Sequence, residues 1–102
     1  MISPHIASVR LRTSAQRLAE IRTRLEAALS PESLQVDDES HLHVGHEGAK
    51  GGLGHFRVLV VSDEFQGQSQ IKRHRLVYQA MGDLMQTDIH ALTIEAFTAD
   101  EF

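Results

Sequence analysis

The sequence predicts one small α+β domain, in which a helix, two strands, a second helix and a third strand form a three-stranded mixed sheet with helices packed on it. Three observations predict this class. Apolar residues recur at helical spacing over 18–29, short apolar segments flank a glycine-rich stretch, and the second segment leads into another helical pattern and a further strand. A chain of 102 residues, 41% of them hydrophobic, has room for one core.

The first helix begins with a capping signal. Thr13 is a good N-cap residue, and Gln16, three positions later, completes a capping box. The pair Ser30-Pro31 ends the helix. Its apolar stripe consists of Leu18, Ile21, Leu25, Ala28 and Leu29. Residues 1–13 are interpreted as a flexible arm, because their faint resemblance to a transit peptide lacks a good apolar face, and residues 14–102 as the domain.

The next two strands enclose a long loop. Over residues 34–39, Leu34, Val36 and Asp38 alternate with Gln35, Asp37 and Glu39, which predicts a short strand with one solvated face. The Val-rich segment 56–61 is typical of a buried strand and is expected to pair with it as an antiparallel hairpin. The loop 40–54 between them holds five of the seven glycines and three histidines. Loops of this length are usually functional or disordered.

The second half of the chain predicts a βαβ unit. Ser69 is a good N-cap for a helix whose core stripe is Val77, Ala80, Met81 and Leu84. Gly82 lies within this pattern and is expected to let the helix fray, at a cost of ~1 kcal/mol relative to alanine. The last strand, 89–97, is expected to run parallel to the second. By parity, one of its faces should carry His90, Leu92, Ile94 and Ala96.

Composition narrows the classes of partner. The formal net charge of −4 argues against nucleic acid as the main partner, because phosphate binding depends on Lys and Arg. The absence of cysteine excludes disulfides, thiolate catalysis and Cys-ligated zinc within this chain, and it fits a cytoplasmic protein. No apolar run approaches the ~20 residues of a membrane-spanning helix, so no membrane partner is expected. Alone, the chain is expected to be a monomer or a weak dimer.

The histidines are the best candidates for chemistry, because neutral imidazole is the commonest metal ligand. His41, His43 and His46 lie in the glycine-rich loop, where side chains can converge, but their spacing matches no zinc motif and solvated loop histidines are the simpler interpretation. His90 begins a strand, where a metal ligand and a histidine bonded to the backbone are both open interpretations. His74 is expected to be structural, donating to a backbone carbonyl between helix and sheet.

Other kinds of site have weaker support. The Gly-x-x-Gly pairs within 40–54 open a strand rather than a helix and lack the Gly-Lys-Ser/Thr of a P-loop. Lys72, Arg73 and Arg75 near the start of the second helix are candidate nucleic-acid contacts, with a solvated charged face as the commoner explanation. The chain has no GxSxG nucleophile elbow, and we do not expect an enzyme.

Several motifs, taken together in this order and spacing, resemble the BolA family, and the resemblance runs from about Arg17 to Glu101. The motifs are Asp38-Glu39-Ser40 before the histidine loop, His55-Phe56-Arg57-Val58, Val61-Ser62, Phe65-Gln66-Gly67, Arg73-His74-Arg75-Leu76-Val77-Tyr78 and Ile89-His90-Ala91-Leu92, followed by Thr98 and Glu101. The resemblance implies an αββαβ domain similar in topology to class II KH folds.

The resemblance also implies a function. Such proteins partner monothiol CGFS-type glutaredoxins and share a [2Fe–2S] cluster, with a glutaredoxin cysteine and a glutathione thiol on the other side. The ligands implied here are His90 and a loop histidine, which is His43 by its distance from the preceding motif, with His46 as an alternative. Imidazole ligands raise the reduction potential and bind only when deprotonated. A second hypothesis, a DNA-binding transcriptional regulator, would rest on the KH-like fold and the basic start of the second helix. The net charge of −4 predicts weak DNA binding.

Overall fold

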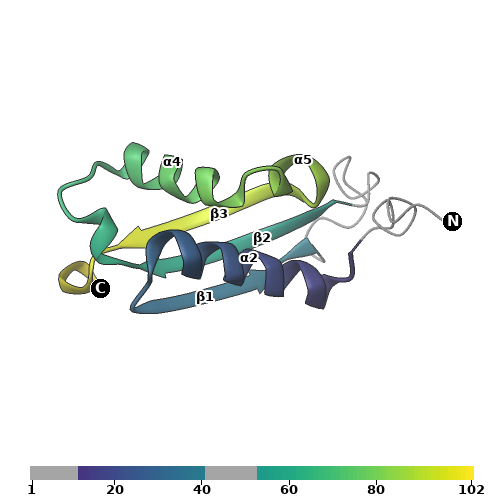
Figure 1. The fold of residues 1–102 in the computed structure, drawn as a ribbon, viewed down its shortest axis with the longest axis horizontal. Helices are drawn as coiled ribbons and strands as arrows, with labels where there is room; N and C mark the ends of the chain where they lie inside the picture. Colours follow the sequence, from purple (N-terminus) through teal and green to yellow (C-terminus); the bar gives the residue numbers. More distant parts are fainter. Residues whose placement is uncertain (1–11, 41–52) are drawn as a thin grey trace, which may run out of the picture.

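The computed structural model describes residues 12–40 and 53–102 (Figure 1). Its sheet has the strand order β1-β2-β3, with β1 at Ser33–Asp38, β2 at Gly54–Val61 and β3 at Ile89–Phe97. β1 is antiparallel to β2, and β2 is parallel to β3. The predicted α+β class and mixed sheet are confirmed. The predicted arm and the predicted long loop lie almost entirely outside the described residues.

The helices pack on one face of this sheet. The α-helices of the described segments are α2 (Ser14–Leu29), α4 (Gln70–Met81) and α5 (Leu84–Thr87), and the 3-10 helices are η2 (Asp63–Phe65) and η3 (Ala99–Glu101). The inward side chains of α2, α4 and β2 belong to a single core, so α2 and α4 cover the same face (Figure 1). The largest buried side chains of this core include Phe56, Phe65, Ile21, Leu25 and Met81. None of these described helices has the length and apolar character needed to cross a membrane.

The boundaries of α2 follow the predicted local signals. The Thr13 Oγ1 accepts from the backbone N–H of Gln16 at 3.1 Å, and the Gln16 side-chain oxygen accepts from the Thr13 N–H at 2.8 Å. This is the reciprocal bonding of a capping box. At the other end, Ser30 adopts a left-handed conformation with φ 43°, and the buried Ser62 donates its hydroxyl to the Leu29 carbonyl at 2.6 Å. Both ends of the helix are therefore satisfied by specific partners.

The second helical segment is divided at Gly82. α4 ends at Met81, and Gly82 forms its C-cap with φ 54°, donating its N–H to the Tyr78 carbonyl at 3.0 Å. A short separate helix, α5, then turns Leu84 into the core. The expected fraying is instead a defined break, because glycine adopts a positive φ at little cost.

β3 departs from regular alternation at its start. Gly54 of β2 pairs with Ile89 of β3. The next residue of β2, His55, pairs with Ala91, so His90 has no counterpart and forms a β-bulge. Ile89 is buried in the core, against which the later even-numbered apolar side chains of β3 also pack. The prediction that His90 shares their face is therefore wrong, because the extra residue reverses the alternation and leaves His90 exposed.

Candidate metal centre

His90 occupies the bulge at the start of β3 and is exposed to solvent. The residues on either side of it along the strand are held by the sheet, because Ile89 and Ala91 are both paired with β2. In the described segments, His90 makes no hydrogen bond or ion pair that would occupy its ring nitrogens. The backbone is thus fixed while the imidazole faces outward, which suits a ligand that meets a partner molecule.

The ends of all three strands meet near His90. The backbone N–H of Gly54 donates to the Asp88 carbonyl at 2.9 Å, which joins the start of β2 to the residue before β3. The backbone N–H of His55 donates to the Ser40 Oγ at 3.1 Å, which joins the start of β2 to the residues after β1. Figure 1 shows these strand ends together at one end of the sheet.

The predicted loop ligands His43 and His46 lie outside the described residues. The described chain stops at Ser40 and resumes at Leu53, and both positions belong to the end of the sheet where His90 lies. The structure therefore brings the two attachment points of the histidine-bearing segment close to His90, and the choice between His43 and His46 stays a prediction.

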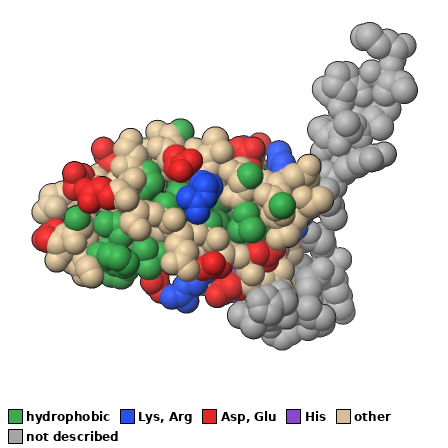
Figure 2. Space-filling model, turned by 90° about the horizontal axis from the view of Figure 1, so that it is seen from below, with side chains coloured by type: hydrophobic (Ala, Val, Ile, Leu, Met, Phe, Trp, Pro, Cys, Tyr) green, Lys and Arg blue, Asp and Glu red, His purple; other side chains and the backbone are tan. Residues whose placement is uncertain are grey.

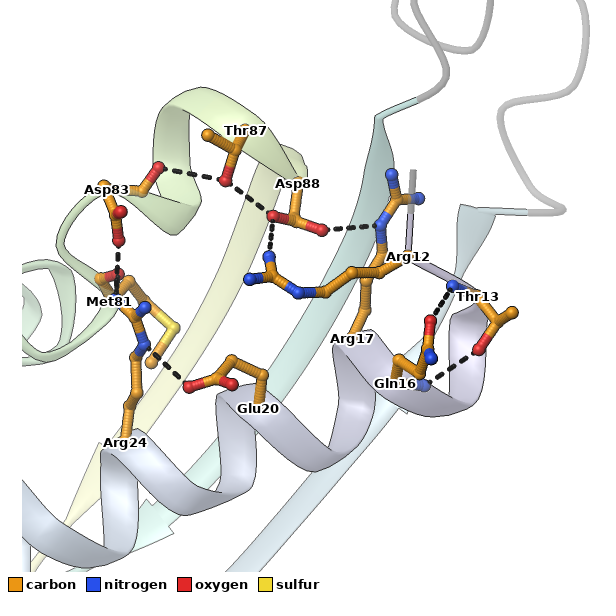
Figure 3. Close-up of polar contacts among 10 residues, drawn as sticks. All are labelled: Arg12, Thr13, Gln16, Arg17, Glu20, Arg24, Met81, Asp83, Thr87 and Asp88. Carbon is orange, nitrogen blue, oxygen red and sulfur yellow. Dashed lines mark hydrogen bonds and ion pairs between the residues drawn. The ribbon is translucent and has the colours of Figure 1, made fainter. Parts of the chain in front are cut away.

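Asp88, two residues before His90, is the centre of a buried ionic cluster (Figure 3). Its carboxylate accepts hydrogen bonds from Arg12, from the Nε of Arg17 at 3.1 Å and from the Oγ1 of Thr87 at 2.6 Å. Burial raises the pKa of Asp88, but the hydrogen bonds from Thr87 and Arg17 and the positive charges of Arg12 and Arg17 outweigh it, so the pKa is lowered. The ionised carboxylate ties α2 to the start of β3.

A second carboxylate, Asp38, ties α2 to the end of β1. It accepts from the Ser14 hydroxyl and, at 2.8 Å, from the backbone N–H of Ser40. Burial raises the pKa of Asp38, but the bonds from Ser14 and Ser40 and the charge of Arg17 lower it below its ordinary value. The first turn of α2 therefore contacts both the end of β1, at Asp38, and the entrance of β3, at Asp88, near His90.

The other two described histidines differ from His90 in their surroundings. His55 is half-buried, and its Nε2 lies 3.1 Å from the Thr93 Oγ1 and 3.9 Å from a carboxylate oxygen of Glu39. His74 is half-buried on α4, and its imidazole makes no hydrogen bond to any described residue. The prediction that His74 donates to a backbone carbonyl is therefore wrong.

The preceding residue, Arg73, makes the helix–sheet contact expected of His74. Its guanidinium donates to the Ala96 carbonyl at 3.1 Å and to the Gln68 carbonyl at 2.9 Å, and it binds both carboxylate oxygens of Glu101 at 2.6 and 3.0 Å. It also lies 5.9 Å from the centre of the Phe65 ring. The helix turns the Arg73 side chain inward, where it satisfies the Gln68 and Ala96 carbonyls.

The burial of Arg73 bears on the candidate nucleic-acid contacts. Arg73 is 5% exposed and fully engaged, whereas Lys72 and Arg75 are exposed on α4. Of the three predicted contacts, only Lys72 and Arg75 are presented to solvent. On the face shown in Figure 2, acidic side chains lie among the basic ones. That face is seen from below Figure 1, on the side away from α4, and it shows no basic stripe of the kind typical of nucleic-acid binding.

His90 can supply one imidazole ligand, which is only part of a metal site. Among residues 12–40 and 53–102, no group of three or more His, Cys, Asp or Glu side chains is arranged to hold a metal ion. The chain also has no cysteine, the usual ligand of iron–sulfur clusters. The exposed imidazole of His90 thus fits a site whose remaining ligands come from other residues or another molecule.

The family model described as BolA-like protein matches residues 25–101 of the chain. The chain belongs to the BolA family. The matched residues include the whole sheet, α4 and the bulge that carries His90.

Individual BolA proteins agree with this assignment. Human BolA-like protein 1 is 49% identical over 80 residues, which cover 78% of this chain and 56% of the human protein. The DNA-binding transcriptional regulator BolA of Escherichia coli K12 is 37% identical over 82 residues, covering 80% of this chain and 75% of the regulator. The solved BolA domain of SufE1 from Arabidopsis thaliana has a TM-score of 0.76 and 42% identity, covering 89% of this chain and 99% of that one. Relative to full-length curated relatives, this chain spans 23% of the A. thaliana SufE-like protein 1 and 56% of mouse BolA-like protein 1.

Proposed function

We propose that this chain is a non-enzymatic partner of a monothiol CGFS-type glutaredoxin and that His90 is its principal ligand to a shared [2Fe–2S] cluster. The observation that carries the proposal is the exposed His90 imidazole on a bulge whose neighbours are paired in the sheet. The thiolates that this chain lacks would come from the glutaredoxin cysteine and from glutathione. A mixed imidazole and thiolate ligand set supplies a reduction potential above that of an all-thiolate cluster.

A second ligand from His43 or His46 completes the proposal. Gly54 and Ser40, which bracket the segment holding both, are bonded to residues at the start of β2 and β3 near His90. In this proposal, one histidine of the segment binds the same iron as His90. His90 would then be the fixed ligand of the pair.

The test follows the absorption and EPR spectra of a mixture of this chain, a CGFS glutaredoxin, glutathione, iron and sulfide. His90→Ala should abolish the mixed imidazole/thiolate spectrum and leave the all-thiolate spectrum of the glutaredoxin homodimer. His74→Ala is the matched control, because it removes a partly exposed imidazole from α4 and should leave the mixed spectrum unchanged. A heterodimer spectrum that is identical with and without His90 would refute the metal role.

His43→Ala and His46→Ala identify the second ligand in the same assay. One of the two should weaken the mixed spectrum more than the other, because only one imidazole is needed beside His90. Equal, negligible effects of both single variants and of the double variant would contradict the participation of this segment.

DNA binding, the activity named for the E. coli relative, has less support here. The bidentate pairing of Arg73 with Glu101 withdraws one of three candidate cations from solvent. We expect weak duplex binding that disappears by about 200 mM salt, because few phosphates can be neutralised. A duplex complex that survives this salt concentration and is lost in Lys72→Ala or Arg75→Ala would favour the DNA-binding role instead.

A further inference from the structure

We propose that Asp88 is a positioning residue for His90, which fixes the bulge of β3 in the register that exposes the imidazole. The functional benefit of positioning His90 rests on the proposed function, whereas the positioning itself is a property of the free chain. It assigns a role to a buried carboxylate that is outside the proposed ligand set and lies two residues from His90.

Asp88 is held from three directions. Its backbone N–H donates to the Leu84 carbonyl of α5 at 2.9 Å, and its carbonyl accepts from the Gly54 N–H of β2 at 2.9 Å. Its carboxylate accepts from Arg17 of α2 and from Thr87. The residue therefore joins α5, β2 and α2 at the point where the chain enters β3.

A bulge needs such an anchor more than a regular strand does. The unpaired His90 interrupts the hydrogen-bonded ladder, and a shift of one residue at the strand start would exchange the inward and outward sides of Ile89 and His90. Such a shift would expose the buried Ile89 and turn His90 toward the core. The bond from Gly54 to the Asp88 carbonyl opposes the shift on one side of the bulge, and the carboxylate contacts hold Asp88 itself in place.

The chain contains a matched ionic contact that lacks this connection. Arg24 of α2 donates to the Asp83 carboxylate at 2.9 Å and to the Met81 carbonyl at 2.6 Å, at the opposite end of α5 (Figure 3). Like Arg17, it joins α2 to the segment between α4 and β3. It makes no bond to β2 or β3, so removing it should affect stability without affecting His90.

The experiment measures the free protein by NMR in the absence of metal and partner. Asp88→Asn keeps the side-chain size and removes the charge that Arg17 pairs with. Hydrogen exchange of the Gly54 amide, measured relative to that of the Val58 amide in the centre of β2, should accelerate roughly tenfold. The reason is that weaker buried hydrogen bonds at Asp88 let the start of β3 open locally more often. Backbone order at His90 should fall in the same variant. Arg24→Gln should leave both the Gly54 to Val58 ratio and the His90 order unchanged.

Two milder variants keep the test decisive if Asp88→Asn does not fold. Thr87→Val removes one hydrogen bond to the carboxylate, and Arg17→Gln removes one charge. Both should accelerate Gly54 exchange in the same direction and by less. Wild-type exchange at Gly54 and wild-type order at His90 in every folded variant would overturn the assignment of Asp88 as a positioning residue.

The cluster spectrum separates this inference from the proposed function. If Asp88→Asn loosens His90 in the free protein and also broadens or shifts the mixed spectrum with glutaredoxin, positioning is supported and has consequences for binding. If His90→Ala leaves the heterodimer spectrum unchanged while Asp88→Asn still loosens His90, the proposed function fails and the positioning role stands.

Discussion

Single residues at the strand end are constrained by their immediate neighbours, and Gly54 is the clearest case. A Cβ atom on Gly54 would lie 2.6 Å from the Phe56 ring and 2.9 Å from the Ser40 Oγ. Phe56 is completely buried, so its ring has little room to move. Glycine at this position lets β2 pass close to the residues after β1.

Gly54→Ala should therefore lower the free energy of unfolding by about 1–3 kcal/mol, as other overpacked sites do. Urea denaturation followed by circular dichroism measures the change. The cost should be smaller in a Phe56→Leu background, because the smaller side chain relieves the contact and the two substitutions are coupled. Fully additive effects would show that the Phe56 ring is not what excludes a side chain at Gly54.

The sequence predicted the identities of the candidate residues better than their surroundings. His90 was expected at the entrance of a strand, and it lies there. The bulge that carries it was not predicted, because the register shift depends on how Gly54 pairs with Ile89 and His55 with Ala91 across the sheet. The inward turn of Arg73 in place of His74 depends on Glu101, whose contact is 28 residues away along the chain. The resemblance to the BolA family, rather than spacing or periodicity, selected His90 among seven histidines.

At the scale of elements, local signals were sufficient where both partners of a contact are close in sequence. The capping box at Thr13 and the N-cap at Ser69, whose Oγ accepts from the Lys72 N–H at 3.2 Å, were predicted and are confirmed. The break at Gly82 was predicted as fraying because propensity describes a glycine inside a helix. It does not describe a glycine that ends one, with a φ of 54° and a ψ of −127°.

The backbone of Gly82 reverses the expected sign of one substitution. In a helix interior, Gly82→Ala would stabilise the protein by up to ~1 kcal/mol. At this positive φ the same change should instead destabilise it by about 1–3 kcal/mol, since alanine is strained in such a conformation. Thermal unfolding distinguishes the two outcomes, with Gln79→Ala on the exposed side of α4 as the control for propensity alone. A higher melting temperature for Gly82→Ala would show that the helix continues through this position.

At the scale of the whole molecule, the last residues of the chain contact α4. Glu101 binds Arg73 and accepts from the Thr98 N–H at 2.8 Å, while Phe102 lies 5.8 Å from Phe97, ring centre to ring centre. The hydrogen bond from Arg73, followed by that from Thr98, lowers the pKa of Glu101 from 4.5 to about 2. These contacts connect η3 and the end of β3 to α4.

This connection predicts a pH dependence of stability. Because the pKa of Glu101 is lower in the folded state, its contribution is fully present above pH 4.5 and is lost as the pH falls toward 2. Glu101→Gln should lower the melting temperature at pH 7 and flatten its decline in that acidic range. Glu64→Gln removes the same charge from an exposed site and serves as the control. Parallel pH profiles of wild type and Glu101→Gln would contradict the role of this carboxylate.

The overall fold was predictable because periodicity, capping residues and β-branched composition together indicate the main helices and strands, and chain order then limits how they pair. The antiparallel β1–β2 pair and the parallel β2–β3 pair both follow from that reasoning. The side-chain contacts of α2 with Asp38 and Asp88 were not predictable, because they join residues 24 and 71 positions apart. Polar residues at such separations leave no periodic pattern in the sequence.

The bulge also means that His90 behaves as an insertion that the sheet does not require. If His90 were deleted rather than substituted, Ile89 opposite Gly54 and Ala91 opposite His55 would become consecutive pairs of an uninterrupted ladder. The shortened chain should keep its fold and its buried Ile89 while lacking the imidazole altogether. The residue on which the proposed function depends most is thus one that the pairing of β2 with β3 does not need.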